Sequence, residues 1–233
     1  QESIYLALLD NLETANQLLS TSTINFGAGD LIYGGDPAKW RKCANSLKLR
    51  LLNRCAGTPW TFTYDMAGTQ ADQITTAGAA AYAGADADIG TILGNSAQYP
   101  IFESNDDNAM LVYPGLPWRN PIFNTLYSRT DQGISHTMTD WLMKRNDPRI
   151  HIYAQPVPNS YTEDDLDSLT YFGFQNGRGI TAAPFPAISL LGTAIAYDEF
   201  APIYVLTYDE VEFIIAEYYL RQNNDAQAQQ YYE

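Results

Sequence analysis

Apolar residues recur every three or four positions at several places in the chain, which is the spacing that puts them on one face of an α-helix. The first such stretch covers residues 3–19, and others cover 37–56, 136–145 and 208–221. The stripe of the first helix consists of Tyr5, Leu8, Leu12, Ala15 and Leu19. The pattern predicts a mainly helical protein.

The second helix has sequence signals at both ends. Asp36 is a favoured N-cap residue, and Pro37 fits the first helical position because the N–H that proline lacks would have no partner there. Gly57 is placed to end the helix. The expected apolar face consists of Trp40, Cys43, Ala44, Leu47 and Leu51.

The last two helices are expected to form an antiparallel pair. Thr207 and Glu210 match the capping box T-x-x-E ahead of the helix over 208–221. Asn223 and Asn224 break that helix, and Asp225 is expected to cap the next one. Two helices joined by so short a turn form an αα-hairpin, the unit of tetratricopeptide-type repeats, although one pair does not establish a repeat array.

Between the helices lie long irregular stretches. Residues 95–133 and 150–206 are irregular and aromatic-rich, with short strands expected at 150–154 and 203–206 and an acidic turn at 162–167. A helix over 79–83 is weakly indicated because glycines surround it. In 136–145, Ser135 is the expected cap, and Met138, Trp141 and Leu142 are the expected apolar side. Loops of this length are usually functional.

Composition narrows the class of protein. Hydrophobic residues make up 45% and charged residues 17% of the 233, which argues against global disorder. The net charge of −14 would repel phosphate backbones, so we expect no nucleic-acid partner. Even so, six of the thirteen Lys and Arg residues lie between Lys39 and Arg54, on the second predicted helix. We interpret them as the polar faces of a scaffold helix, with Arg50 paired to acidic neighbours.

The two cysteines indicate neither a disulfide nor a metal site. Cys43 and Cys55 are twelve residues apart on one predicted helix, or about 18 Å along its axis, too far for a disulfide. No C-x-x-C spacing occurs. No run approaches about 18 apolar residues, so no membrane-spanning helix is expected.

Catalytic chemistry has little support in the sequence. His136 and His151 are the only histidines, and the nucleophile motif G-x-S-x-G is absent. Adjacent carboxylates in polar loops are usually solvated, and we therefore expect no enzyme. Asp106, Asp107 and Asn108 are oxygen donors that could hold Ca²⁺, although the spacing is not that of an EF-hand and a solvated acidic turn is the alternative. No cofactor is required.

Two segments, 95–133 and 171–178, combine aromatic rings with amide groups, which is a composition that suits carbohydrate binding. Aromatic rings bury the C–H face of a sugar while their polar tips and nearby amides meet its hydroxyl groups. The alternative is that these rings pack beneath the loops. The ligand-binding candidates are Tyr113, Trp118, Asn120 and Tyr127 in the first segment, and Tyr171 and Phe172 in "YFGFQNGR".

Three blocks of sequence, in order, carry a resemblance to a known family. The stretch "DLIYGGDPAKWRKCANSLKLRLLNR" from Asp30 is similar to the D-x-x-Y-x-G-D-x-x-x-W-x-x-x-A-N-S-L-x-x-R pattern of the SusD/RagB family of nutrient-binding lipoproteins. "SHTMTDWLMKRNDPRIHIYAQP" and "PIYVLTYDEVEFIIAEYYLR" resemble two further segments of that family, and its SusD_2-like branch is the most similar. The residues that match the first pattern are Asp30, Tyr33, Gly35, Asp36, Trp40, Ala44, Asn45, Ser46, Leu47 and Arg50.

The resemblance implies a fold, a location and partners. The expected fold is mainly α, with tetratricopeptide-like helical hairpins supporting a large irregular loop-rich region. Residues 1–233 would form a single SusD-like domain fragment that lacks the N-terminal and C-terminal parts of the family's full length. The implied protein is lipid-anchored on the outer membrane, through an N-terminal segment outside this sequence.

The implied partner is a SusC-like TonB-dependent transporter barrel, to which the protein would deliver oligosaccharides or peptides. The alternative from another class is a helical-repeat scaffold that binds only protein, which the αα-hairpin and the acidic surface favour. The two differ in whether the aromatic residues of 99–127 are exposed to a ligand or buried.

Overall fold

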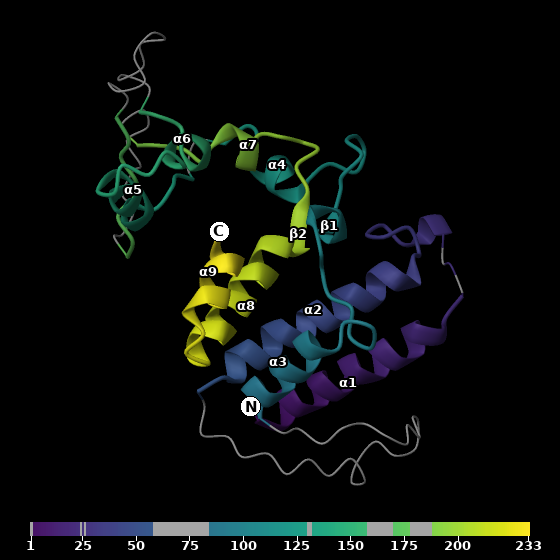
Figure 1. Cartoon of the computed structure of the whole chain (residues 1–233). Helices are drawn as coiled ribbons and strands as arrows, with labels where there is room; N and C mark the ends of the chain where they lie inside the picture. The colour runs from purple at the N-terminus through teal and green to yellow at the C-terminus, as the bar shows by residue number, and fades with distance from the viewer. Residues whose placement is uncertain are drawn as a thin grey trace. The chain divides into compact units, whose positions relative to one another are not determined.

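The computed structural model of the chain describes residues 2–23, 25, 27–57, 84–129, 132–157, 170–177 and 188–233. The chain divides into two compact units (Figure 1). Unit 1 contains residues 1–111 and 204–233, and unit 2 contains residues 112–203. The sequence-based prediction of one domain fragment over 1–233 stays a prediction.

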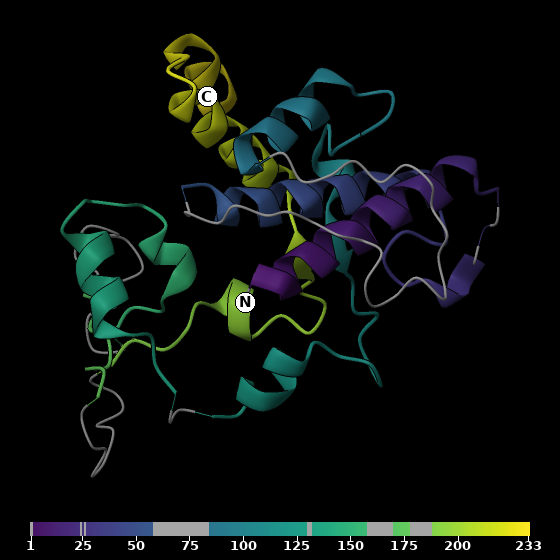
Figure 2. The ribbon, with the colours of Figure 1, turned by 90° about the horizontal axis from the view of Figure 1, so that it is seen from below.

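Unit 1 is a helical scaffold. Its first two helices, α1 and α2, lie side by side and run in opposite directions, as Figures 1 and 2 both show. Strands β1 and β2 pair as a small sheet, and α8 and α9 form the predicted αα-hairpin. The helices are α1 (Glu2–Thr21), α2 (Pro37–Cys55), α3 (Ala85–Gly94), α8 (Tyr208–Arg221) and α9 (Asp225–Tyr232). Shorter elements are η1 (Gly27–Gly29), η2 (Asn105–Asp107), β1 (Ala109–Leu111) and β2 (Ile203–Leu206).

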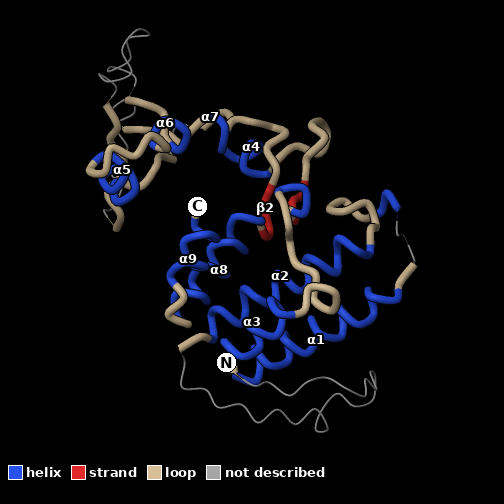
Figure 3. The backbone as a smooth tube through the Cα atoms, viewed as in Figure 1, coloured by secondary structure: helices blue, strands red, loops and turns tan. Residues whose placement is uncertain are grey.

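In the residues that the structure describes, unit 2 consists mainly of loops, which carry four short helices. Figure 3 shows how much of this unit is loop. Its helices are α4 (Pro121–Leu126), α5 (His136–Met143), α6 (Ile150–Tyr153) and α7 (Thr193–Ala196). Contacts run from α4 to α7, from α7 to α6 and from α6 to α5, so α4 and α5 lie at different ends of the series. The predicted combination of helical hairpins with a large irregular region is confirmed.

Helix α2 begins and ends as its sequence predicts. The Asp36 carboxylate accepts hydrogen bonds from the N–H groups of Ala38 and Lys39, at 2.8 and 3.3 Å, and Pro37 is the first helical residue. Gly57 follows the C-cap with a φ of +73°, a left-handed conformation that glycine adopts without strain. Cys43 and Cys55 are both buried, and no disulfide joins them.

The predicted apolar face of α2 was only partly right. Leu49 and Leu52 are wholly buried, whereas Trp40, Leu47 and Leu51 are partly buried. The reason is that α2 packs against α1, α3 and α8 together, so its buried surface is wider than one stripe. Side chains buried against it include Leu9, Ile89, Phe102, Val211 and Ile215, each worth about 1.5–3 kcal/mol of hydrophobic stabilisation.

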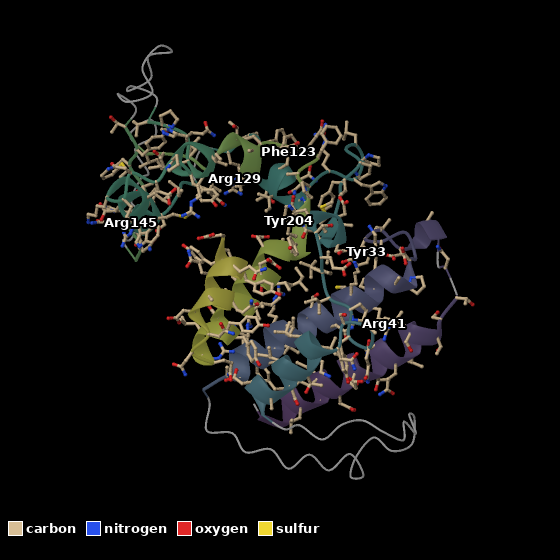
Figure 4. The ribbon with its side chains drawn as sticks, in the orientation of Figure 1. Tyr33, Arg41, Phe123, Arg129, Arg145 and Tyr204 are labelled. Atoms are coloured by element: carbon tan, nitrogen blue, oxygen red, sulfur yellow. The ribbon has the colours of Figure 1, made fainter. Side chains whose placement is uncertain are left out.

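The cations of α2 bind neighbouring elements of unit 1. Lys48 Nζ lies 2.6 Å from Glu13 on α1, and Lys42 Nζ lies 2.6 Å from Glu103 and 3.0 Å from Asp107. Arg41 donates to the backbone carbonyl of Gln98 at 2.6 Å (Figure 4). These contacts explain why an acidic protein concentrates its cations here: they hold together α1, α2 and the segment before β1.

Arg50 confirms its predicted pairing. Its Nε and Nη2 groups both donate to the carboxylate of Glu210 on α8, and Nη2 also donates to the carbonyl of Val205 at 2.9 Å. This use of Glu210 corrects the predicted capping box. Thr207 occupies the N-cap position of α8, but its side chain makes no capping bond.

The family-like pattern around Asp30 is a structural motif. One Asp30 oxygen accepts from the N–H groups of Ile32 and Tyr33, at 3.0 and 3.3 Å. The other accepts from the N–H of Gly35 at 2.8 Å and from the Trp40 indole at 2.6 Å. The Tyr33 and Trp40 rings pack edge to face, 5.1 Å apart. The carboxylate therefore fixes the approach of the chain to α2.

Four local predictions need correction. Residues 150–154 were expected as a strand but form the short helix α6, and α4 lies within the predicted irregular segment 95–133. Asn224, not Asp225, is the N-cap of α9. Ser135 precedes α5 as expected, but its side chain makes no capping bond. The weakly indicated helix over 79–83 and the acidic turn 162–167 lie outside the described residues.

Candidate functional site

The predicted ligand residue Trp118 lies at the end of a tight turn in unit 2. Gly115 and Trp118 form an isolated antiparallel bridge, with a cis peptide bond between Leu116 and Pro117. Gly115 has a φ of +86°, and an added Cβ there would lie 2.7 Å from the Phe200 ring, so this position requires glycine. Trp118 is 72% exposed. The alternative that Trp118 packs beneath the loop is therefore wrong.

Asn120, another predicted ligand residue, has a structural role instead. It is 1% exposed, and its side-chain oxygen accepts from the N–H groups of Ile122 at 2.7 Å and Phe123 at 3.3 Å, which caps α4. Its amide nitrogen donates to the carbonyl of Ala201 at 2.7 Å. A buried amide with these partners is unable to reach a ligand, which corrects the predicted ligand contact.

The same turn is tied to the segment 198–201. Arg119 Nε lies 2.6 Å from Glu199 Oε2, and the N–H of Asn120 donates to the carbonyl of Glu199 at 3.0 Å. Both side chains of the Arg119–Glu199 ion pair are less than one-third exposed. The chain on either side of Trp118 is therefore held by hydrogen bonds, an ion pair and a helix cap.

Aromatic rings continue along α4. The Arg119 guanidinium lies 5.4 Å from the centre of the Phe123 ring, and Phe123 stacks on Tyr127 with centroids 5.1 Å apart and planes 15° apart. These three residues are four positions apart, which is the spacing of neighbours on a helix face. Figure 4 labels Phe123 on this helix. We use the name aromatic surface for the exposed or partly exposed rings of this turn, of α4 and of the segment 198–201, which are Trp118, Phe123, Tyr127 and Phe200.

The other aromatic candidates have differing environments. Tyr113 is half-buried ahead of the turn. Tyr99 and Phe102 are buried in the core of unit 1. The aromatic residues of 99–127 therefore separate into a structural group and an exposed group. Neither hypothesis, that all of them are exposed to a ligand or that all of them are buried, holds for the whole segment.

Tyr171 and Phe172 belong to a second neighbourhood of unit 2. Tyr171 is buried, which raises the pKa of its phenol, and its hydroxyl lies 2.7 Å from His151 Nδ1. Phe172 is exposed, with its ring 5.8 Å from that of His136 at the start of α5. Phe172 is thus available to a ligand and Tyr171 is a core residue. The two predicted groups of ligand residues lie near opposite ends of the helix series.

A hollow of about 630 Å³ lies beside α5. Its lining consists of Ser135, Thr137, Met138, Trp141, Leu142, Arg149, Tyr153 and Asn176. The sequence analysis placed Met138 and Trp141 on the buried side of this helix, but both are exposed, and only Leu142 of that group is buried. We call this feature the α5 hollow. Arg145 follows Trp141 by four residues, just past the end of α5, and its guanidinium lies 4.0 Å from the centre of the Trp141 ring. This spacing was the sequence signal that could have shown the contact.

Two of the three candidate calcium ligands have other roles. Asp107 is buried, and its Oδ2 accepts from Lys42 and from the N–H of Glu103 at 2.8 Å. Asn108 Oδ1 accepts from the N–H of Tyr208 at 2.6 Å, and Asp106 is exposed. Within the described ranges, no group of three or more His, Cys, Asp or Glu residues is placed to hold a metal ion. Calcium binding here stays a prediction that these contacts do not favour.

Comparison with known proteins places the whole chain in one family. No curated protein matches the sequence. A SusD homolog from Bacteroides fragilis shares 25% identity at a TM-score of 0.77, over 100% of this chain and 47% of that one. A SusD homolog from Bacteroides vulgatus shares 26% identity at 0.69, over 100% and 42%. A chitin-binding protein shares 22% identity at 0.66, over 100% and 46%, which shows the fold alone.

The chain thus spans about half the length of these solved relatives. The family model described as "Starch-binding associating with outer membrane" matches residues 1–233. Because that match covers the entire sequence, in agreement with the three blocks around Asp30, Ser135 and Tyr208, the chain belongs to the SusD-like_2 family.

Proposed function

We propose that this chain is part of a cell-surface protein that captures oligosaccharides, or peptides, for uptake across the outer membrane. The observation that carries the proposal is the exposure of Trp118 on a backbone held from both sides. Trp is enriched in binding surfaces because its ring combines a large apolar face with a polar N–H group.

The ordered backbone around Trp118 should favour ligand affinity. Binding to a flexible loop loses free energy because the loop must be ordered, at about 0.5–1.5 kcal/mol per immobilised side chain. The Asn120 cap and the Arg119–Glu199 pair order this loop before a ligand arrives. The aromatic surface can then offer its rings to the C–H faces of sugars with little further ordering.

Delivery to a transporter is the finer part of the proposal. A lipid-anchored protein would hold the ligand above a SusC-like TonB-dependent barrel, which would carry it inward. The family's association with the outer membrane supports this role. In the part of the chain that the structure describes, no helix has the length and apolar character needed to cross a bilayer.

The test is a binding panel with the full-length protein. Maltoheptaose, chitohexaose, cellohexaose and a peptide library are titrated by calorimetry. We expect saturable binding to at least one oligosaccharide or peptide. Absence of binding throughout the panel would contradict nutrient capture.

The transporter role is tested separately by purification from outer membranes. We expect a TonB-dependent barrel to co-purify with the tagged full-length protein. If a nutrient binds but no barrel accompanies the protein at any salt concentration, capture stands and the proposed delivery fails.

A protein-binding scaffold is the second candidate, and one observation favours it. A hollow of about 610 Å³ between α8 and α9 is lined mainly by apolar side chains, among them Phe213, Leu220 and Tyr232. Tyr232 is 71% exposed. If this hollow is the functional surface, the wild-type protein should capture a protein partner from the outer membrane and bind no glycan. Tyr232→Ala should then abolish capture of that partner.

A further inference from the structure

The α5 hollow has the composition of a small-molecule site. Its volume of about 630 Å³ lies within the range of about 300–1,000 Å³ typical of such sites. Apolar side chains of Met138, Trp141 and Tyr153 form part of the lining, and hydroxyl, amide and guanidinium groups form the rest. This mixture differs from the mainly apolar hollow of α8 and α9, which suits another protein segment better than a polar ligand.

Trp141 is held in place while it remains accessible. The Arg145 guanidinium lies 4.0 Å from the centre of its ring, and an Arg145 Nη1 group donates to the Trp141 carbonyl at 3.3 Å. The ring is 48% exposed and lines the hollow. Stacking by an arginine orders an aromatic ring, which lowers the entropy that a ligand must remove on binding.

The polar groups of the hollow are aligned with one another. Ser135 Oγ donates to Asn176 Oδ1 at 3.1 Å, and Asn176 Nδ2 donates to Thr137 Oγ1 at 3.2 Å. An amide and two hydroxyl groups keep further donors and acceptors after these bonds are made, because the amide has two N–H groups and each oxygen has two lone pairs. Hydroxyl groups of a ligand can therefore form hydrogen bonds with Ser135, Thr137 and Asn176.

The guanidinium that lines the hollow is paired with a carboxylate. Arg149 lines it and donates from Nε and Nη2 to both carboxylate oxygens of Asp147. These bonds to Arg149 lower the pKa of Asp147 to about 2, so the pair stays ionised at physiological pH. An anionic ligand would have to compete with Asp147 for Arg149, whereas a neutral ligand can use the edges of the planar pair.

We propose that the α5 hollow is a second carbohydrate subsite, which takes a neutral pyranose ring stacked on Trp141 with its hydroxyl groups toward Asn176 and the Arg149–Asp147 pair. The proposal rests on the proposed function in one respect, the oligosaccharide class of the ligand. It adds that binding occurs at a place separate from the aromatic surface. An oligosaccharide would then meet unit 2 at either of two sites.

The experiment reports on the two sites independently. The full-length protein is labelled with 5-fluorotryptophan, and its fluorine signals are assigned by single Trp→Phe variants. Maltoheptaose, chitohexaose and cellohexaose are then titrated. We expect the Trp141 signal to shift saturably with at least one of them. A shift confined to Trp118 would keep the proposed function and overturn the second subsite. No shift with any sugar would also overturn the second subsite, while capture of peptides would still be decided by the binding panel.

Affinity measurements complete the test. For a glycan that shifts Trp141, Trp141→Ala should weaken calorimetric affinity for the α5 hollow about three- to tenfold, the range expected for one aromatic contact. Met143→Ala is the matched control, because Met143 is exposed on the same helix but does not line the hollow. Equal affinities for the wild type and both variants would contradict the subsite.

Discussion

At the level of single residues, Trp118 and Asn120 lie two positions apart and have opposite environments. Both were predicted as ligand residues from residue type and loop placement. Trp118 is exposed, as a ligand residue must be, and its contact with a ligand stays a prediction, whereas Asn120 is buried as a helix cap. The cap was not predicted because α4 has six residues and too few apolar repeats to show in the sequence. Residue type indicates chemistry, but burial depends on contacts from distant segments such as Ala201.

The different burial of Asn120 and Trp118 predicts different effects of their substitution on unfolding free energy. Asn120→Ala removes the cap and leaves the buried carbonyl of Ala201 without its partner, so we expect a loss of about 2–3 kcal/mol in unfolding free energy. Trp118→Ala should change it by less than about 0.5 kcal/mol because the ring is exposed. Urea unfolding of both variants measures the difference. Similar losses for the two would contradict these assignments.

Asp30 gives a pH prediction. Burial raises the pKa of Asp30, but hydrogen bonds from Ile32, Trp40, Gly35 and Tyr33 lower it more, so the net pKa lies below the ordinary 3.8. A group with a lowered folded-state pKa contributes stability above its unfolded pKa, and this contribution is lost as the pH falls through the folded value.

Asp30→Asn should therefore be less stable than the wild type at pH 7, and the difference in urea midpoint should shrink as the pH falls below about 4. Unfolding curves at several pH values between 7 and 2.5 measure this. A difference that stays constant over the range would show that the Asp30 charge is not what holds the loop.

At the level of elements, α2 shows what a sequence pattern can and cannot predict. Its cap, first proline and terminal glycine are local signals, and all three were correct. The width of its buried face was underestimated because three other helices contact α2. The positions of those helices cannot be predicted from the sequence of α2 alone. For the same reason Arg50 could be predicted to pair with an acidic residue, but not with Glu210 specifically.

The pair between α2 and α8 can be measured directly. Arg50→Ala should lower the unfolding free energy by about 1–2 kcal/mol, because a partly exposed ion pair is weaker than a buried one. A double-mutant cycle with Glu210→Gln should show positive coupling between the two sites. The exposed pair of Lys144 and Asp140 is the control, and Lys144→Ala should have little effect. Zero coupling would contradict a stabilising role for the pair.

At the level of the whole molecule, the two units have distinct compositions. Unit 1 is a helical scaffold whose family-like motif around Asp30 is used for folding, while unit 2 carries the exposed Trp118 and Trp141. Two of the three sequence blocks that identified the family lie mainly in this scaffold, where caps and buried pairs restrict residue choice at fixed spacings. The ligand residues could be predicted only in part, since exposure and hollows arise from tertiary contacts.

The most direct measurement compares two exposed aromatic residues in the full-length protein. Calorimetry with a bound glycan of the panel is performed on wild type, Trp118→Ala and Tyr232→Ala, whose rings are 72% and 71% exposed in units 2 and 1. Capture through the aromatic surface predicts about tenfold weaker binding for Trp118→Ala and unchanged binding for Tyr232→Ala. Unchanged affinity in Trp118→Ala, or an equal loss in both variants, would contradict the account.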